Sequence, residues 1–322
     1  MKTKSKLGLL LLLSLTLLLP GCIADDLSNC GISVHFRYIK NVSETDLFAE
    51  QVNRITLFIF DDEGRYIDSR SESGAALSES GYRMNIGLER GRYTLVAWGN
   101  LEEEYELPEF TPQSSHIDEV LLSLRCLDNM VEDHPSHLFF GRDSIEIVPD
   151  NTGRTNVLMD LMKDTNTIRV TLRGLPLEED YADESGVVTP LMPYRCAITS
   201  VNRSYNFDNT IAGDDRLTYI PAYHLTPSDN VVKTGFVTLR ELNDGSTGSR
   251  LTVHDTLPTR AGSNDGLLLD VSLTELLIAA SVTNDLDIDD LFEIEIEFDY
   301  TAGTATIFIN GWVYGEEEWS VG

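Results

Sequence analysis

The segment Phe292–Ile309, FEIEIEFDYTAGTATIFI, shows the fold class most plainly. Its first half alternates apolar and acidic side chains, which is the period of a β-strand with one buried face and one solvated face. The turn formers Thr301–Gly303 then lead into a second β-rich run, Thr304–Ile309. The segment therefore predicts a β-hairpin with one dry face.

Short runs rich in β-branched and aromatic residues recur along the rest of the chain, separated by Gly, Pro, Asn and Asp. They are Ile32–Ile39, Val52–Phe60, Tyr82–Leu88, Tyr93–Trp98, Leu138–Phe140, Ile145–Val148, Asn156–Leu161, Thr167–Leu172, Tyr194–Val201, Leu217–Ala222, Gly235–Leu239 and Arg250–His254. Helical spacing of apolar residues occurs in Gln113–Arg125 and in Glu275–Ser281. The sequence therefore predicts a mostly β protein of two β-sandwiches with few short helices.

The first 21 residues have the composition of an export signal. Three lysines precede an apolar run, Leu7–Leu19, which is shorter than the roughly 20 residues of a membrane-spanning helix. The following Leu19–Cys22 resembles a lipobox with an atypical central proline, so we expect cleavage before Cys22 and covalent lipid on that cysteine. The alternative is an ordinary signal peptide whose Cys22 is structural. Asp25 and Asp26 resemble the acidic pair that directs lipoproteins of Bacteroidota to the outside of the outer membrane.

The composition is strongly acidic, with 53 acidic residues against 24 basic ones and a formal net charge of -29. Such a surface repels nucleic acid and anionic lipid headgroups, so membrane attachment is expected to depend on the covalent lipid. The acids are scattered along the chain, which indicates solubility rather than a single binding face. Three further cysteines, Cys30, Cys126 and Cys196, allow at most one internal disulfide, and the three possible pairings stay open.

No motif in the chain specifies catalysis. The acids Glu293, Glu295 and Glu297 alternate with apolar residues, so they are expected on the solvated face of one strand rather than in a catalytic pair. The sequence has no nucleophile elbow, phosphate loop or dinucleotide-binding glycine motif. We therefore predict that the protein is not an enzyme. A hydrolase whose two carboxyls meet only in the folded chain, roughly 5 to 9.5 Å apart, is an alternative.

Two sets of candidate metal ligands are incomplete. Asp285, Asp287 and Asp289 have the first three ligand spacings of an EF-hand loop, but an Asp replaces the required Gly and an Ile occupies the twelfth position. His134 and His137 form a pair in a loop that supplies no further convergent ligands. We therefore predict no metal and no cofactor.

Several short motifs occur in the order typical of one known family. They are Cys22 with Asp26–Cys30, Val52–Phe60 running into Asp61–Gly64, Gly91–Gly99, Asp164–Val170 and Ile309–Trp312. With these motifs, nearly the whole chain resembles the fimbrillin-A associated anchor protein family of Bacteroidota. The resemblance implies two tandem transthyretin-like β-sandwich domains, which we place at 31–163 and 164–322, after a signal peptide at 1–21 and a lipidated tether at 22–30.

The resemblance also implies a function. The expected protein is a non-enzymatic anchor or accessory subunit of a fimbrium, joined to pilin subunits by β-strand complementation and tethered to the outer membrane. In this family's polymers, stalk subunits exchange strands after a protease removes an N-terminal segment at an arginine. Such a cut would release a protein lipidated at Cys22, so we expect the N-terminal segment to be retained, as suits a base subunit. The tail Trp312–Gly322 has three possible fates: it packs on its own domain, is donated to a partner, or frays.

A surface glycan-binding lipoprotein is the alternative from another class, with exposed aromatic residues such as Trp98, Trp312 or Trp319 stacking on sugars. The position of Trp98 within a predicted strand favours the core for that side chain. A contiguous aromatic platform on a loop face would favour glycan binding, whereas an apolar groove along a strand edge would favour fimbrial assembly.

Overall fold

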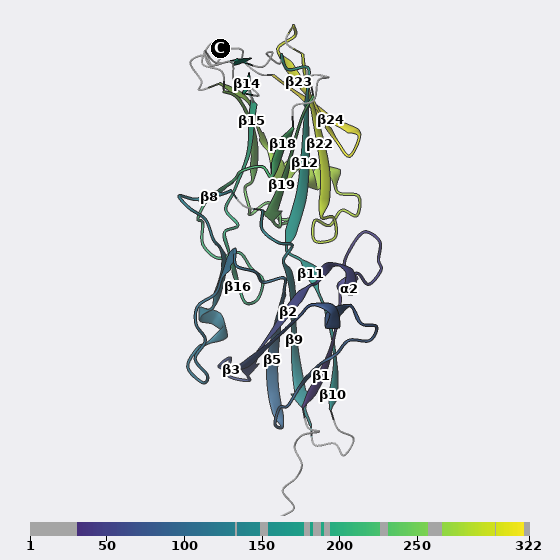
Figure 1. Ribbon diagram of the computed structural model, residues 1–322, viewed down its shortest axis with the longest axis vertical. Helices are drawn as coiled ribbons and strands as arrows, with labels where there is room; N and C mark the ends of the chain where they lie inside the picture. Colours follow the sequence, from purple (N-terminus) through teal and green to yellow (C-terminus); the bar gives the residue numbers. More distant parts are fainter. Residues whose placement is uncertain are drawn as a thin grey trace, which may run out of the picture.

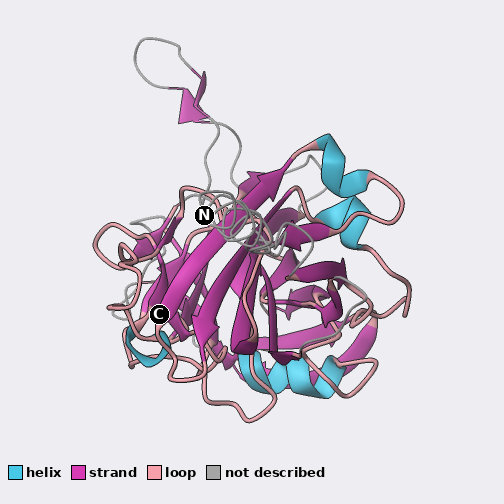
Figure 2. Cartoon of the chain, turned by 90° about the horizontal axis from the view of Figure 1, so that it is seen from below, coloured by secondary structure: helices cyan, strands magenta, loops and turns pink. Residues whose placement is uncertain are grey.

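The computed structural model describes residues 31–318 except 133, 149–153, 177–180, 183–187, 190–193, 226–230, 257–265 and 300. It is elongated, with two β-sandwiches stacked along the long axis (Figure 1). The few short helices lie at the periphery of the strands (Figure 2). The predicted mostly β fold is thereby confirmed. The predicted signal peptide, Cys22, Asp25, Asp26, Cys30 and Trp319 lie outside the described residues.

The N-terminal sandwich is formed by two sheets. The smaller has the order β10-β1-β4, with β10 (Thr155–Asp160), β1 (Ile32–Arg37) and β4 (Met84–Ile86). The larger has the order β11-β9-β5-β2-β3, with β11 (Met162–Lys163), β9 (Phe139–Ile147), β5 (Gly91–Gly99), β2 (Arg54–Asp61) and β3 (Tyr66–Ser73). The short helices α2 (Phe48–Gln51) and η3 (Ala75–Ser78) lie in its connections.

The C-terminal sandwich pairs a six-stranded with a five-stranded sheet. The six-stranded sheet has the order β18-β19-β12-β22-β23-β24, with β18 (Tyr223–Leu225), β19 (Val232–Leu239), β12 (Thr165–Arg173), β22 (Leu291–Asp299), β23 (Thr304–Ile309) and β24 (Trp312–Glu318). The other has the order β21-β20-β15-β17-β8, with β21 (Leu267–Ser272), β20 (Arg250–Asp255), β15 (Tyr194–Ser200), β17 (Leu217–Tyr219) and β8 (Met130–Val131). Smaller elements complete the fold: the sheet β16 (Ser204–Asn206), β7 (Leu121–Leu124) and β6 (Tyr105–Glu106), the pair β13 (Tyr181–Ala182) and β14 (Val188–Thr189), and the helices η4 (Ile117–Glu119) and α3 (Leu273–Ala280).

β2 is buried on both of its faces. Leu57 and Ile59 pack in the core between the two N-terminal sheets, whereas Phe58 and Phe60 contact the ring of Phe207 on the opposite side. A near-continuous apolar run is typical of such a doubly covered strand. The second face of β2 belongs to the same apolar cluster that fills the C-terminal sandwich, so the hydrophobic core continues from one sandwich into the other.

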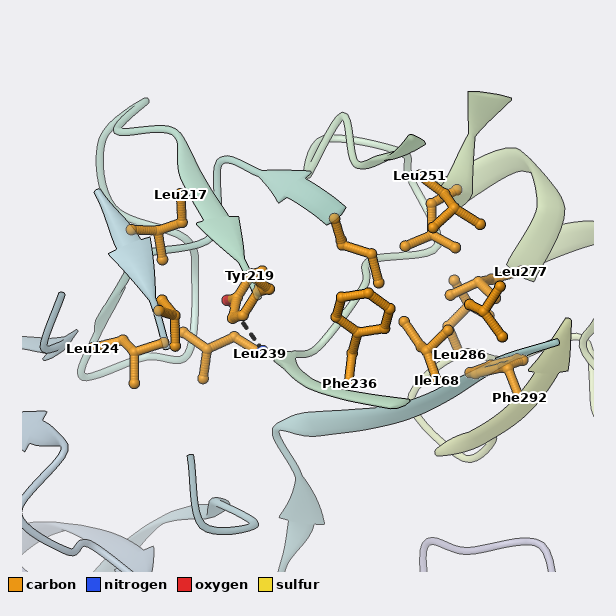
Figure 3. Packing of buried hydrophobic residues seen from close by; sticks show 14 of the residues in the cluster. Leu124, Ile168, Leu217, Tyr219, Phe236, Leu239, Leu251, Leu277, Leu286 and Phe292 are labelled. Atoms are coloured by element: carbon orange, nitrogen blue, oxygen red, sulfur yellow. Dashed lines mark hydrogen bonds between the residues drawn. The ribbon is translucent and has the colours of Figure 1, made fainter. Parts of the chain in front are cut away.

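The C-terminal core is closed by side chains from sheet and helix together. Ile168, Phe236 and Phe292 of the six-stranded sheet belong to one buried cluster with Leu251 of β20 and Leu277 of α3 (Figure 3). Each fully buried side chain of this size contributes about 1.5 to 3 kcal/mol of transfer free energy. This core therefore holds the two C-terminal sheets together.

The two halves of the chain share strands. β8 pairs in parallel with β17, and β7 pairs antiparallel with β16, so strands that precede residue 132 share two sheets with strands that follow residue 193. The domain division expected at 163/164 falls between β11 and β12, and these two pairings cross it. The sandwiches are thus coupled by backbone hydrogen bonds as well as by the shared core.

The predicted helix over Gln113–Arg125 is wrong. The segment forms the one-turn η4 and then strand β7, in which Leu122 and Leu124 are buried and Leu121 is exposed. The apolar residues fit both a helical and an alternating period, and pairing with β6 and β16 selects the strand. Tertiary pairing overrides local spacing here.

Other expectations are confirmed or extended. The C-terminal hairpin is β22 and β23, with the even-numbered apolar residues of β22 and the odd-numbered ones of β23 buried, and with the three glutamates on the other face. The second predicted helix is α3, whose N-cap Ser272 accepts a hydrogen bond from the backbone of Glu275 at 3.3 Å. The edge strands β3 and β24, which have few buried apolar residues, were not predicted, and β9 is one continuous strand where two were expected.

Candidate functional site

β1 is the central strand of its sheet and is held on both sides. It forms six parallel residue pairs with β10 and three antiparallel pairs with β4. Its side chains Ile32, Val34 and Phe36 are fully buried. Without β1, a groove one strand wide and lined by apolar side chains would separate β10 from β4. The chain closes this groove with its own N-terminal strand.

Both ends of the β1–β10 pair are secured by hydrogen bonds. The Thr155 backbone N–H donates to the Gly31 carbonyl at 2.8 Å, and the Leu161 N–H donates to the Arg37 carbonyl at 2.7 Å. The Arg37 guanidinium also binds the carboxylate of its cross-strand partner Asp160 through two hydrogen bonds of 2.8 and 3.0 Å. The bidentate geometry fixes the relative register of the two strands.

An ionic network lies where the two sandwiches meet. Lys163 of β11 binds Asp290 at 2.6 Å, and Lys40 binds Asp287 at 3.0 Å. Asp287 also forms an ion pair with Arg240 at 2.6 Å. Lys40 and Lys163 thereby connect the N-terminal sandwich to the loop before β22. Arg240, the residue directly after β19, is bound to the same loop. We call these residues, together with Asp164, the joint.

Asp164 is the most deeply buried charge of the joint. Its carboxylate lies 3.1 Å from Arg240 and accepts a hydrogen bond from Asn209 at 3.1 Å. Burial raises the pKa of Asp164 to about 6, against the opposing effect of Arg240. Next to it in space, His137 contacts the Thr165 hydroxyl at 3.0 Å, and burial together with the Lys163 charge lowers the pKa of His137 to about 4. Burial thus shifts the pKa of both groups toward the neutral form, upward for Asp164 in the joint and downward for His137 beside Thr165.

The three aspartates considered for calcium are engaged within the chain. Asp287 belongs to the joint, and Asp285 accepts a hydrogen bond from the Asn243 side chain at 2.9 Å. Asp289 accepts hydrogen bonds from the Ser281 hydroxyl and, at 3.1 Å, from the Thr283 backbone. Their role in this structure is to shape the loop before β22 and to hold it against the N-terminal sandwich.

The outer edge of the six-stranded sheet carries an exposed apolar run. On β24, Trp312 is 81% exposed, Val313 67% and Tyr314 42%. The corresponding edge strand of the N-terminal sandwich, β3, is largely polar, with the sequence YIDSRSES. Polar edges of that kind protect a sheet against pairing with another chain, whereas an apolar edge invites it. Of these two edges, only β24 presents consecutive exposed apolar side chains.

The remaining candidates have structural positions. Trp98 is fully buried and packs against Phe140, which confirms the core interpretation. Cys126 and Cys196 are free thiols, and burial raises the pKa of Cys196 to about 12. Trp312 lies on a strand edge beside Val313 rather than on a loop platform.

Within the described part of the chain, no group of three or more His, Cys, Asp or Glu residues is placed to hold a metal ion. None of the helices described is long and apolar enough to cross a membrane.

The joint was not predicted from the sequence. Its only sequence signal was the position of Lys163, Asp164 and Arg240 directly beside strands β12 and β19, in a chain where cations are scarce. Their partners Asp287 and Asp290 were identified as acids but assigned to an incomplete metal loop. Such a cluster depends on contacts between residues that are 47 to 247 positions apart, for which a single sequence contains no local pattern.

Two sandwiches that share strands define a protein of the tandem β-sandwich class. The family model of the fimbrillin-A associated anchor proteins Mfa1 and Mfa2 matches residues 27–318. The chain therefore belongs to the fimbrillin-A associated anchor family, a family of fimbrial structural proteins rather than enzymes.

Individual relatives support this assignment. The minor fimbrium anchoring subunit Mfa2 of Porphyromonas gingivalis is 25% identical over 226 residues, which are 68% of this chain and 65% of that protein. The chain thus matches slightly less than two thirds of the length of this relative. The solved structure of the fimbrial anchor protein Mfa2 from P. gingivalis superposes with a TM-score of 0.70 at 21% identity, covering 88% of this chain and 98% of that one.

A Bacteroides thetaiotaomicron protein described as a candidate polysaccharide-binding protein has the same fold. Its TM-score is 0.73 at 24% identity, covering 88% of this chain and 96% of that one. A likeness at this identity shows the fold and does not assign glycan binding to this chain.

Proposed function

We propose that the chain is the membrane-anchored terminal subunit of a fimbrium. Its N-terminus is tethered to the outer membrane by lipid on Cys22, with Asp25 and Asp26 directing it to the cell surface. Its partners are pilin subunits. Domains 31–163 and 164–322 together form the body between the membrane and the fibre.

The observation that supports the proposal is the burial of β1 at the centre of its sheet. In a polymerising subunit of this family, removal of the N-terminal segment opens a groove that a neighbour's strand can fill. Here β1 occupies the centre of its sheet, and Cys22 precedes Ile32 by only ten positions. The same segment therefore serves as tether and as internal strand, and in the described part of the N-terminal sandwich β1 fills the position between β10 and β4 that a donor strand would need. A subunit of this kind ends a fibre.

The contact with the fibre is proposed at β24. A pilin strand pairing along this edge would satisfy the unpaired main-chain groups of the sheet and cover Trp312, Val313 and Tyr314. Main-chain hydrogen bonds would supply affinity, and the aromatic and β-branched side chains would fix the register. β-Strand complementation thus takes place at the sandwich distant from the membrane.

Mass spectrometry of protein extracted from native membranes tests the tether, comparing wild type with Cys22→Ala. We expect a lipidated Cys22 peptide, a co-purifying pilin, and fibres shed into the medium by the variant. Lipidated protein without any pilin, combined with a variant that sheds no fibres, would contradict the anchor function. An unlipidated wild-type protein would contradict the tether.

A further inference from the structure

We propose that the fold is a load-bearing link, in which tension between the tether and the distal sandwich acts lengthwise on β1 and β12. The inference rests on the proposed anchoring through Cys22, because only a tethered N-terminus brings tension to β1. It adds a mechanical function to the anchor.

The first step concerns how β1 meets β10. Ile32 pairs with Thr155 and Arg37 with Asp160, so both strands run toward the joint, and the start of β1 is its end farthest from the joint (Figure 1). Tension from the tether acts on that distant start. β10 instead continues at its other end through Leu161 and β11 into β12 of the distal sandwich. The two strands are therefore pulled from opposite ends, along their own axes.

This direction of pulling places the hydrogen bonds of the pair under shear. In a parallel pair the bonds are evenly spaced along the strands, and sliding one strand past the other strains all of them together. When a hairpin is pulled apart from one end, the bonds break one after another. Forced unfolding depends on the height of the unfolding barrier, and simultaneous rupture raises that barrier.

Side chains oppose sliding as well. A shift by one residue would move Val34 and Phe36 out of the core and bring polar neighbours in, because successive residues face opposite sides of a strand. The same shift would break the bidentate contact between Arg37 and Asp160. Exposed ion pairs contribute little to equilibrium stability, so the contribution of this pair is to the register.

The second sandwich repeats the arrangement. β12 receives the load at its start and lies between two neighbours, with eight residue pairs to β19 and seven parallel pairs to β22. Arg169 lies opposite Glu293 and binds it at 3.2 Å. Lys163 and Asp164, the two residues before β12, are held by Asp290 and Arg240. The joint thus secures the backbone at the point where the load passes from one sandwich to the next.

Single-molecule force spectroscopy on the purified chain tests the inference, with handles at two pairs of positions. One pair is the N-terminus and Thr301 in the distal turn, which loads β1 against β10 in shear. The other is the N-terminus and Val148, just after β9 and before β10, which pulls the two strands from the same end. We expect a severalfold higher rupture force for the first pair. Equal forces in both geometries would overturn the proposal.

A reversible cross-link provides the matched control. Ser33 and Asn156 are cross-strand partners, so the double variant Ser33→Cys, Asn156→Cys is designed to join β1 to β10 by a disulfide. We expect the β1 rupture event to disappear under oxidising conditions and to return in the same molecules after reduction. An unchanged event in oxidised, cross-linked molecules would show that β1 is not the strand that ruptures.

These measurements are independent of fibre assembly. If Cys22→Ala sheds fibres but the rupture force is the same in both pulling geometries, the proposed anchor function stands and the load-bearing proposal is wrong. If the rupture force depends on the pulling geometry but the protein is not lipidated and binds no pilin, the proposed anchor function is wrong. The source of tension on which the inference rests is then absent.

Discussion

Arg240 and Asp164 form a buried ion pair at the joint, with Nε of the arginine 3.1 Å from a carboxylate oxygen of the aspartate. The arginine side chain is 9% exposed and the aspartate is fully buried. A buried pair of this kind loses hydration on folding and stabilises the fold only to the extent that its geometry and its other hydrogen bonds compensate. The raised pKa of Asp164 shows that burial prevails over the attraction of Arg240.

Asp164 is expected to make stability fall as pH rises through the weakly acidic range. Its folded-state pKa of about 6 lies above the ordinary value of 3.8, so the folded state binds the proton more tightly than the unfolded state. Its contribution is therefore fully present below about pH 4 and is lost by about pH 6, by up to about 3 kcal/mol. Urea denaturation of wild type and Asp164→Asn at pH 4 to 7 measures the difference. Asp118→Asn, at an exposed position, leaves Asp164 in place and should keep the wild-type pH profile. Identical profiles for wild type and Asp164→Asn would contradict the prediction.

His137 is expected to act in the opposite direction. Its folded-state pKa of about 4 lies below the ordinary 6.5, so the folded state favours the neutral ring. Its contribution is complete above pH 6.5 and is lost as pH falls toward 4. Wild type should therefore lose stability relative to His137→Gln over this range in urea titrations. The replacement His254→Gln in the distal sandwich is the control, and an identical pH profile for both variants would contradict the prediction.

Lys163 is expected to matter far more than a surface cation. Its side chain is 6% exposed, whereas that of Arg169, also paired with an acid, is 53% exposed. Lys163→Met leaves Asp290 without its cation and should lower the free energy of unfolding by about 1 to 3 kcal/mol. Arg169→Met should change it by about 1 kcal/mol or less. If both variants lose the same free energy of unfolding in chemical denaturation, the buried ion pair of Lys163 contributes no more to stability than a surface pair.

The two sandwiches are expected to unfold as one cooperative unit. β8 and β7 pair with β17 and β16 of the second half of the chain, and the cluster around Phe58 and Phe207 spans the boundary. Calorimetry should show a single transition whose calorimetric and van't Hoff enthalpies agree. Two resolved transitions would mean that the sandwiches are thermodynamically independent.

The β24 edge is expected to be required for pilin binding and dispensable for folding. Val313→Lys places a charge on an edge strand at a position that is 67% exposed, so the melting temperature should change little. Pilin co-purification should be lost. Leu158→Lys alters an exposed apolar residue on β10 and should leave pilin bound. If the β24 variant still binds pilin, the fibre contact does not lie at β24.

Local patterns predicted many of the buried strands. The alternation that begins at Phe292 predicted the hairpin of β22 and β23. The predicted turn at Asp61–Gly64 connects β2 to β3, and Asp61 accepts hydrogen bonds there from the backbone of Glu63 and Arg65. Edge strand β3 was missed because one face and one edge of it contact water, which leaves little apolar pattern. β7 was misread because its apolar spacing suits two conformations.

The sequence by itself determined the β fold, the family and the expectation of a tethered N-terminus, because these depend on short-range periodicity and on contiguous motifs. Only the tertiary structure placed β1 between β10 and β4, brought Lys163 to Asp290 and Arg240 to Asp164, and exposed the apolar edge of β24. These features join residues separated by tens to more than a hundred positions. Their formation depends on how sheets pair and on which charges the packed core excludes from water, and no local stretch of chain encodes either.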